Sequence, residues 1–246
     1  MAQVELSFVL PAYNEGESIE SALDSLYRAG KDTGLQYEIV VVDDGSVDDT
    51  GVRALDYASR NGRAKNGHVK IVSYRPNVGK GYAVKTGFLR ACGDAVVFVD
   101  SDLEIDVGRV GRYVEALGHG DIVVGCKRHP ESVVDVPLVR RVLSCGFNAL
   151  VRLLTGVRLR DTQTGLKAIR RRTLEDVFPR LAVKRYAFDV ELLAVAHLLG
   201  LRVVELPVTV RSRRLFKIRD VWFMLLDLLG IAYRLRVLRW YQHALR

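Results

Sequence analysis

Long apolar runs and cysteine are both scarce in this sequence of 246 residues. No stretch of about 20 apolar residues lacks a charged residue, so we expect no transmembrane helix. The N-terminus does not join a basic segment to an apolar run, which argues against a signal peptide. The three cysteines, Cys92, Cys126 and Cys145, are widely spaced and indicate neither a disulfide framework nor a zinc site. We therefore expect a protein of the reducing cytoplasm.

Acidic residues are in deficit. Asp and Glu number 29 against 37 Lys and Arg, which leaves a formal net charge of +8. From Arg211 onward nine basic residues face only Asp220 and Asp227, so this tail holds nearly the whole surplus. Such a charge suits nucleic acid, an anionic membrane or a phosphorylated substrate. Here the basic residues accompany an apolar face and not a stacking platform for bases, which disfavours nucleic acid.

The composition is that of a globular protein, with 49% hydrophobic and 27% charged residues. In the first 125 residues, short apolar runs alternate with helical patterns. The runs predict buried strands at Leu6–Leu10, Ile39–Val42, Val69–Val72, Ala95–Val99 and Ile122–Val124. The helical patterns lie at Ser18–Arg28, Thr50–Arg60, Tyr82–Ala91 and Val107–Leu117. This alternation predicts an α/β fold, a doubly wound and mostly parallel sheet flanked by helices, with ligands at the carboxyl ends of the strands.

The alternation changes after Pro137. We expect helices at Leu138–Leu154, around Leu174–Phe178 and at Phe188–Leu199, with a short strand at Leu166–Ile169. Val203–Glu205 and Val208–Val210 are expected to form a final pair of strands around Pro207. No stretch resembles a linker between two independent domains.

The last segment, Asp220–Leu245, is a basic amphipathic pattern with two tryptophans, Trp222 and Trp240. Its most apolar part, Val221–Tyr233, is too short to span a bilayer. We interpret it as an interfacial helix on an anionic leaflet. The alternative is a helix packed on the sheet or on a second subunit, with its basic residues solvated.

Polar clusters follow three of the expected strands: residues 11–15, 43–46 and 100–102. One such aspartate can simply cap a helix. Two carboxylates separated by one residue, Asp100 and Asp102, can instead converge on a hard divalent cation that prefers oxygen ligands. Such a cation assists the departure of a diphosphate.

These strings carry a family resemblance. PAYNE, VVDDGS, NVGKGYAVKTG and VDSD resemble glycosyltransferase family 2, whose members use nucleotide sugars and have the GT-A fold. DTQTGLKAI (161–169) and RYAFDVELL (185–193) resemble the dolichyl-phosphate glucosyltransferase and polyprenyl-phosphate mannosyltransferase branch, and the Gln after DT is closer to the glucosyl type. The resemblance implies a GT-A domain over 1–212, with a donor half (1–125) and an acceptor half (126–212), followed by a membrane-association segment (213–246).

By this resemblance, Pro11, Tyr13, Glu15 and Asp44 contact the nucleobase and ribose of the donor. Lys80 lies between two glycines at the start of a helix, where it suits a diphosphate.

The resemblance also places Asp100 and Asp102 in the metal-binding DxD motif, with Mg²⁺ or Mn²⁺ as the cofactor. Asp102 is the safer ligand of the two. Glu104 occupies a position where relatives can carry a further polar ligand, the alternative being a solvated acid.

The implied acceptor is a lipid phosphate, which is already ionised at pH 7 and needs no strong general base. The site must then supply cations and in-line geometry. Lys127 stands where relatives have the Arg of Gly-Ser-Arg, and Arg128 can supply bidentate contact. The further candidates for the acceptor phosphate are Arg140 or Arg141, Arg211 and Arg213, each of which could equally be a solvated surface residue.

Asp161 and Gln163 lie in the turn that, by resemblance, faces the sugar and the acceptor. Asp161 could order nearby Arg or Lys side chains, bind a sugar hydroxyl or act as a base. We favour the ordering role. Asp189 and Glu191 could simply be charges at a helix N-terminus. The resemblance instead favours a position near the sugar for at least one of them. We expect Asp102, Asp161, Lys127 and Arg128 to carry the reaction.

We therefore predict a metal-dependent, inverting glycosyltransferase at the cytoplasmic face of a membrane. It moves a hexose, glucose from UDP-glucose in the favoured case, to a polyprenyl or dolichyl phosphate and gives a β-linked product. The alternatives are a GDP-mannose-dependent dolichyl-phosphate mannose synthase, a family 2 transferase with a non-lipid acceptor, and a non-catalytic scaffold. The intact DSD and PAYNE strings argue against the scaffold.

Overall fold

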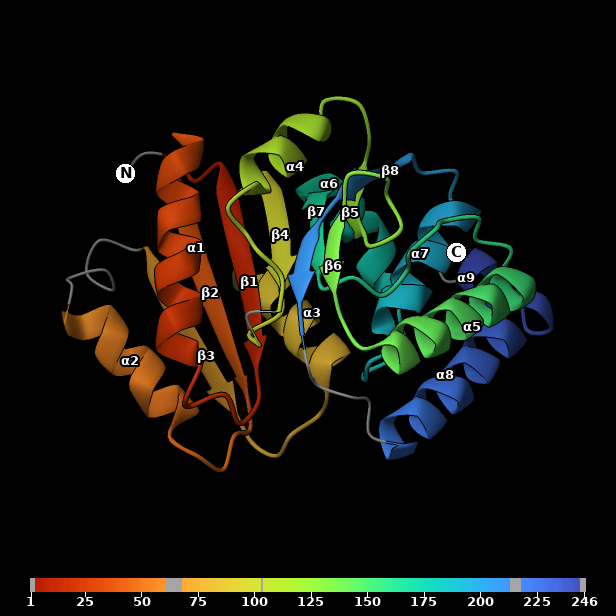
Figure 1. Ribbon diagram of the computed structural model, residues 1–246, viewed down its shortest axis with the longest axis horizontal. Coiled ribbons are helices and arrows are strands. Elements are labelled where there is room, and N and C mark those ends of the chain that lie inside the picture. The colour runs from red at the N-terminus through yellow and green to blue at the C-terminus, as the bar shows by residue number, and fades with distance from the viewer. Residues whose placement is uncertain (1–2, 61–67, 103, 213–217, 244–246) are drawn as a thin grey trace.

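The computed structural model describes residues 3–60, 68–102, 104–212 and 218–243. A seven-stranded sheet runs through the molecule in the order β3-β2-β1-β4-β7-β5-β8, with helices on both faces (Figure 1). Its strands are parallel except β7, which runs antiparallel to β4 and to β5. They are β1 (Leu6–Ala12), β2 (Tyr37–Asp44), β3 (Val69–Tyr74), β4 (Ala95–Val99), β5 (Ile122–Cys126), β7 (Leu166–Arg170) and β8 (Val203–Pro207). The α/β fold class predicted from the alternation is confirmed.

The central strands are buried on both faces, which explains why their sequences are predominantly apolar. All seven residues of β1 are buried, and Ala12 at its end lies beside Asp43 of β2. Because β1, β2 and β4 are parallel, their carboxyl ends meet at one edge of the sheet. Asp44 and Asp100 emerge at this edge.

Each face of the sheet has its own layer of helices. Alternate residues of a strand point to opposite faces, so Phe8 and Leu10 belong to one core and Val9 to the other. The first face is covered by α1 (Ile19–Thr33), α2 (Thr50–Arg60) and α4 (Val110–Ala116). The second is covered by α3 (Lys80–Arg90), α5 (Leu138–Thr155), α6 (Arg171–Val177) with the 3₁₀ turn Phe178–Arg180, α7 (Phe188–Leu198), α8 (Ile218–Arg236) and α9 (Trp240–His243).

The two strands expected near Pro207 do not pair with each other. Val203–Glu205 lies in β8, beside β5 in the main sheet. Val208–Val210 overlaps β9 (Thr209–Arg211), which pairs with β6 (Val133–Asp135) in a separate two-stranded sheet. The sequence does not predict β6, because a strand of three residues is too short to show an alternating pattern.

The C-terminal segment is packed into the domain. α8 lies against α5 and places Leu228 and Ile231 in the core, and Tyr241 of α9 is also buried. The helix expected in the last segment is α8, which ends at Arg236; the backbone then turns at Arg239, whose φ is 49°, and the short helix α9 follows. Residues 213–217 and 244–246 of the predicted membrane segment lie outside the described residues. Within the described ranges, no helix combines the length and apolarity that crossing a bilayer requires.

One buried carboxylate fastens this C-terminal segment to the rest. Glu191 on α7 accepts hydrogen bonds through Oε2 from the backbone N–H groups of Ala182 and Val183, at 2.9 and 2.7 Å. Through Oε1 it accepts hydrogen bonds from the Tyr241 hydroxyl at 2.6 Å and from Arg234 at 3.3 Å. Glu191 has no exposed surface, so its carboxylate is stabilised by these four hydrogen-bond donors and not by solvent.

Glu191→Ala should therefore be strongly destabilising. It leaves four donors without their acceptor, and we expect the free energy of unfolding to fall by about 4 kcal/mol. Urea denaturation followed by circular dichroism measures this change. Tyr241→Phe removes only one hydroxyl and should cost about 1 kcal/mol. Equal losses in the two variants would show that Glu191 does not organise the network.

Candidate functional site

The loops after β1 and β2 are fastened to each other. The Asn14 N–H donates to Ser46 Oγ at 3.0 Å, and the Glu15 N–H donates to Thr50 Oγ1 at 2.8 Å. Asn14 has a φ of 54°, a conformation that Asn adopts more readily than most residues. The turn leaves Tyr13 46% exposed. Tyr13 and Glu15, two of the expected nucleotide contacts, therefore lie at the carboxyl edge of the sheet.

Asp44 anchors the loop that leads into α3. Its buried carboxylate accepts hydrogen bonds from the N–H groups of Val78 and Gly79, both at 2.9 Å, and from Asn77 Nδ2 at 2.8 Å. Gly79 has a φ of 117°, and a Cβ there would lie 2.5 Å from the Lys184 carbonyl oxygen. Only glycine fits this position. Asp44, expected to contact the nucleotide, thus also sets the approach to Lys80.

Lys80 belongs to a chain of alternating charges. Its Nζ lies 2.7 Å from Asp100 Oδ1 and 3.3 Å from Asp189 Oδ2, and Lys167 Nζ lies 2.8 Å from Asp189 Oδ1. Burial raises the pKa of Asp189, but the Lys167 and Lys80 charges outweigh it and hold this pKa below its usual value. Burial lowers the pKa of Lys80, but Asp100 and Asp189 raise it above its usual value. Asp189 and Lys80 therefore stay charged at neutral pH.

Beneath this chain lies a small cavity whose lining includes Pro11, Lys80, Asp100 and Gly165. Pro11 is buried at the end of β1, so it forms part of the floor of the site and does not protrude from it.

Asp100 and Asp102 directly follow β4. The Asp100 N–H donates to the Gly165 carbonyl oxygen at 3.1 Å, and a Cβ on Gly165 would lie only 1.8 Å from Asp100 Oδ2. The absence of a side chain at residue 165 therefore makes room for the Asp100 carboxylate. Burial and the negative charge of Asp100 raise the pKa of the Asp102 carboxyl to about 6. Crowded carboxylates of this kind suit a divalent cation, which relieves their repulsion.

Glu104, the expected third metal ligand, is engaged elsewhere. Its carboxylate forms an ion pair with Arg140 at 2.6 Å and accepts a hydrogen bond from the Ser212 hydroxyl. The described residues contain no group of three or more His, Cys, Asp or Glu side chains that could hold a metal ion. The expectation for Glu104 is corrected accordingly. Asp100 and Asp102 fit a Mg²⁺- or Mn²⁺-type site in which waters and substrate phosphates complete the coordination.

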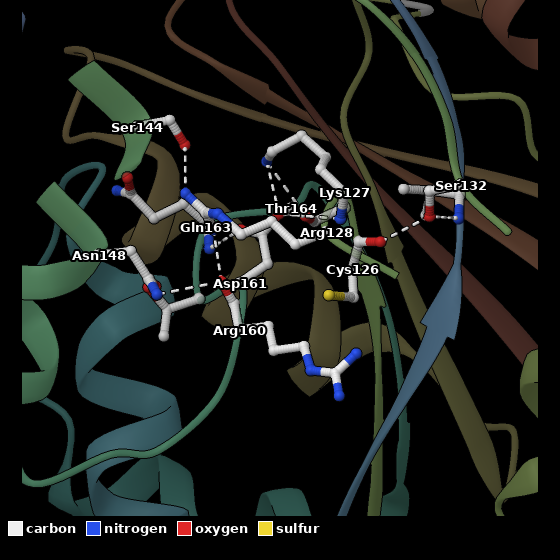
Figure 2. Close-up of polar contacts among 12 residues, drawn as sticks. Cys126, Lys127, Arg128, Ser132, Ser144, Asn148, Arg160, Asp161, Gln163 and Thr164 are labelled. Carbon is white, nitrogen blue, oxygen red and sulfur yellow. Dashed lines mark hydrogen bonds and ion pairs between the residues drawn. The ribbon is translucent and has the colours of Figure 1, made fainter. Parts of the chain in front are cut away.

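Asp161 orders the turn before β7 (Figure 2). Its Oδ2 accepts hydrogen bonds from the Lys127 N–H at 3.1 Å and the Thr164 hydroxyl at 2.7 Å, and lies 3.0 Å from Lys127 Nζ. Its Oδ1 accepts from the Gln163 N–H at 3.1 Å, so Gln163 belongs to the same turn. Burial raises the pKa of Asp161, but the Lys127 charge and these hydrogen bonds lower it below its usual value. A carboxylate held in this way is suited to ordering Lys127 and unsuited to accepting a proton.

Lys127 and Arg128 diverge, although they are adjacent in the sequence. Lys127 folds back onto Asp161, whereas Arg128 runs toward α5, donates to the Arg160 carbonyl oxygen and lies 3.4 Å from Cys145 Sγ (Figure 2). The structure thus separates two cations that the sequence assigns to one acceptor phosphate.

The other expected phosphate ligands are dispersed. Arg141 is exposed and donates to the Val134 carbonyl oxygen at 3.2 Å, and Arg211 is exposed on β9. Arg213 lies outside the described residues. Asp189 lies within the Lys80 cluster, but Glu191 is fully buried against Tyr241 and is not part of the site. The positioning role expected for Glu191 is corrected on this ground.

Sequence reasoning missed Lys167. It lies in β7 between Leu166 and Ala168 and is 1% exposed. A lysine within a buried apolar strand is a signal that a charged partner lies opposite, because an unpaired buried charge is costly. The sequence does not say that the partner is Asp189, because that residue follows 22 positions later on another element.

Comparison with known proteins gives a consistent result. Residues 7–178 match the family model described as glycosyl transferase family 2. The chain is 34% identical to the dolichyl-phosphate beta-glucosyltransferase of Dictyostelium discoideum, over 83% of this chain and 66% of that protein. It is 31% identical to the dolichyl-phosphate beta-glucosyltransferase of Homo sapiens, over 94% of this chain and 75% of that protein. The chain thus spans about two thirds to three quarters of the length of these relatives.

Solved structures with a similar fold include glucosyl-3-phosphoglycerate synthase from Mycobacterium tuberculosis in complex with uridine diphosphate. Its TM-score is 0.69 at 26% identity, over 93% of this chain and 80% of that chain. A second structure of that enzyme contains Mn²⁺, uridine diphosphate and glucosyl-3-phosphoglycerate, and has a TM-score of 0.68 at 24% identity, over 94% of this chain and 79% of that chain.

Proposed function

Because the chain belongs to glycosyl transferase family 2, we propose that it transfers glucose from UDP-glucose to the phosphate of a polyprenyl lipid such as dolichyl phosphate. An oxygen of the lipid phosphate attacks the anomeric carbon on the face opposite the nucleoside diphosphate. The bond from the anomeric carbon to the diphosphate oxygen breaks, and the electron pair leaves with the diphosphate. The product is a β-linked lipid-phosphate sugar.

The observation that carries this proposal is the pairing of Asp161 with Lys127. A hydroxyl acceptor needs a base to remove its proton. At the acceptor turn, Asp161 is already occupied by Lys127 and by the Thr164 hydroxyl, and its pKa is lowered. The turn therefore offers an acceptor a cation, and this suits a nucleophile that arrives already ionised.

On the donor side, Asp100 and Asp102 would hold Mg²⁺ or Mn²⁺, which when bound supplies positive charge beside the leaving diphosphate. Lys80 adds a second positive charge at the same edge of the sheet, and Gly79 lets the backbone approach the donor closely. Asp189 and Lys167 keep Lys80 in place. Tyr13, Glu15 and the loop anchored by Asp44 would bind the nucleoside.

A donor panel tests the proposal. The purified chain is incubated with labelled UDP-glucose or GDP-mannose, a divalent cation and polyprenyl phosphate, and the product is read by mass. We expect transfer from UDP-glucose and none to polyprenol, which lacks the phosphate. Transfer from GDP-mannose alone would overturn the donor assignment, and equal transfer to polyprenol would overturn the phosphate acceptor.

The surface formed by α5 and α8 supports a place at an anionic membrane. The two helices lie side by side (Figure 1). Their exposed large apolar side chains are Leu138, Val139, Val142, Leu143, Leu150 and Leu153 on α5 and Trp222, Leu226, Leu229 and Tyr233 on α8. Exposed arginines border this α5–α8 face at 141, 152, 219 and 236. An apolar face rimmed by arginines matches an anionic bilayer surface. The cysteines are all unpaired, which suits the cytoplasmic side of that membrane.

The double variant Trp222→Glu with Leu229→Glu should detach the protein from vesicles. Both side chains are more than half exposed, at 60% and 57%, so the fold should survive. We expect vesicle affinity to fall about thirtyfold or more, because two apolar contacts are lost and two negative charges are added. Sedimentation with anionic phospholipid vesicles measures this. Val52→Glu with Leu55→Glu, on exposed positions of α2, is the matched control, and an equal fall there would contradict the assignment to α8.

A further inference from the structure

We propose that the ring of Tyr186 packs against the hexose of the nucleotide sugar. Tyr186 lies in the segment between the 3₁₀ turn and α7. Its side chain is 51% exposed, and within the described ranges no hydrogen bond or ring contact holds it. This inference rests on the proposed function, which supplies the donor, and it adds a residue that contacts the sugar.

The backbone around Tyr186 is held from two sides. The carbonyl oxygen of Lys184 accepts a hydrogen bond from the Tyr82 N–H, in the first turn of α3, at 3.2 Å. On the other side, Arg185 forms an ion pair with Asp227 of α8 at 3.2 Å. Tyr186 is therefore carried by a segment that is fixed between α3 and α8, so its position is set before a ligand binds.

The start of α7 lies beside the donor site. Asp189, three residues after Tyr186, lies 3.3 Å from Lys80 Nζ and 2.8 Å from Lys167 Nζ. Lys80 Nζ in turn lies 2.7 Å from Asp100. The segment that carries Tyr186 thus adjoins the charged groups assigned to the cation and the diphosphate.

The electrostatic surroundings of the Tyr186 hydroxyl agree with this placement. Burial and the negative charge of Asp220 raise its pKa above the usual value, Lys80 opposes this rise, and Asp100 adds to it. Two groups of the diphosphate site, Lys80 and Asp100, are therefore close enough to act on this hydroxyl. The phenol is neutral at pH 7 and presents an uncharged ring.

The order of the strands places the hexose near this ring. The nucleoside contacts come from the loops after β1 and β2, the cation site from the end of β4, and the acceptor turn from the loop before β7. Because β7 is the neighbour of β4, the hexose of a donor extended along this edge lies between Asp100 and the turn at Asp161. The start of α7 reaches the same interval, since Asp189 is paired with Lys167 of β7.

An exposed aromatic ring suits a sugar. The C–H groups on the face of a hexose carry partial positive charge, and the face of an aromatic ring is negative. Contact between the two buries apolar surface and leaves the sugar hydroxyls available for hydrogen bonds. Tyr82 is also exposed, but its ring packs edge-on against Tyr74, with the ring centroids 5.3 Å apart. The ring of Tyr186 has no such partner among the described residues and can meet the hexose.

Calorimetric titration of the whole chain tests the proposal, with UDP and UDP-glucose as ligands, Mn²⁺ present and no acceptor. We expect Tyr186→Ala to weaken the affinity for UDP-glucose about tenfold and to leave that for UDP unchanged, because UDP lacks the hexose. Tyr186→Phe keeps the ring and should bind both ligands as the wild type does. Leu89→Ala, at the far end of α3 and 70% exposed, is the control and should also leave both affinities unchanged.

The two ligands separate the possible failures. Unchanged affinity for UDP-glucose in Tyr186→Ala, or equal weakening for UDP and UDP-glucose, would overturn the contact with the hexose and leave the proposed donor in place. A loss in Tyr186→Phe as large as that in Tyr186→Ala would show that the hydroxyl acts and would overturn the stacking of the ring. A wild-type chain that binds neither ligand would overturn the donor of the proposed function, and this inference with it.

Discussion

Asp102→Asn should reduce sugar transfer at least about a thousandfold, because it removes a charged oxygen ligand at the place where the diphosphate departs. Asp100 alone cannot restore the site, because it is also bonded to Lys80. The turnover number for transfer from UDP-glucose, at saturating donor and acceptor, measures this loss. Asp106→Asn is the control, since Asp106 is exposed and its carboxylate accepts a hydrogen bond from the Gly108 N–H, away from the donor site. Transfer at the wild-type rate by Asp102→Asn would remove the metal proposal.

The same variant should keep or improve its stability in the presence of a chelator. Burial and Asp100 raise the pKa of Asp102 to about 6 in the folded protein. The folded state therefore binds a proton more tightly than the unfolded chain, and stability falls as the pH rises from about 4 through 6. Asn cannot ionise, so at pH 7 its melting temperature should equal or exceed that of the wild type. A lower melting temperature would show that the carboxylate is well accommodated.

Gly165→Ala should lower transfer about a hundredfold and destabilise the fold. The added methyl would lie 1.8 Å from Asp100 Oδ2 and 2.3 Å from Cγ. Either Asp100 leaves its position or β7 moves away from β4, and both changes break the Asp100–Lys80 pair or the hydrogen bonds beside it. Steady-state kinetics and thermal unfolding, measured on the same preparation, test both effects.

A second glycine provides the matched control. Gly146 lies inside α5, and a Cβ there would meet nothing within 4 Å. Gly146→Ala should therefore stabilise the protein by about 0.5–1 kcal/mol, because Ala favours the helix, and should leave the turnover number unchanged. If Gly165→Ala behaved in the same way, the close contact with Asp100 would have no functional meaning.

The family and the fold class could be predicted from the sequence because their signals are local. Strands such as Leu6–Ala12 are buried on both faces, so all their residues except Ser7 are apolar and carry the same signal. The position of β7 could not be predicted in this way. Leu166–Ile169 is apolar apart from Lys167 and correctly predicted as a strand, but nothing within it indicates that it enters antiparallel between β4 and β5.

In the candidate site, too, the features that depend on local sequence could be predicted, and the features that depend on packing could not. Asp100 and Asp102 are recognisable because their spacing and their place after a strand are both local. Glu104 has the same spacing, yet its side chain forms an ion pair with Arg140, which lies 36 positions away in the sequence. Asp189 and Glu191 are two residues apart on α7 and therefore about 200° apart around the helix, so they face different neighbours. Which of them faces Lys80 depends on how the helix packs, which their spacing does not reveal.

The bond between Glu191 and Tyr241 has a practical consequence for anyone preparing this enzyme without detergent. A truncation before α9 would remove the Tyr241 hydroxyl, which donates a hydrogen bond to the buried Glu191 carboxylate. Any loss of activity in such a preparation would then reflect the damaged fold and not the absence of lipid. Outward-facing side chains of α8, such as Trp222, are the safer targets for improving solubility, because they can be exchanged while the last helices stay in place.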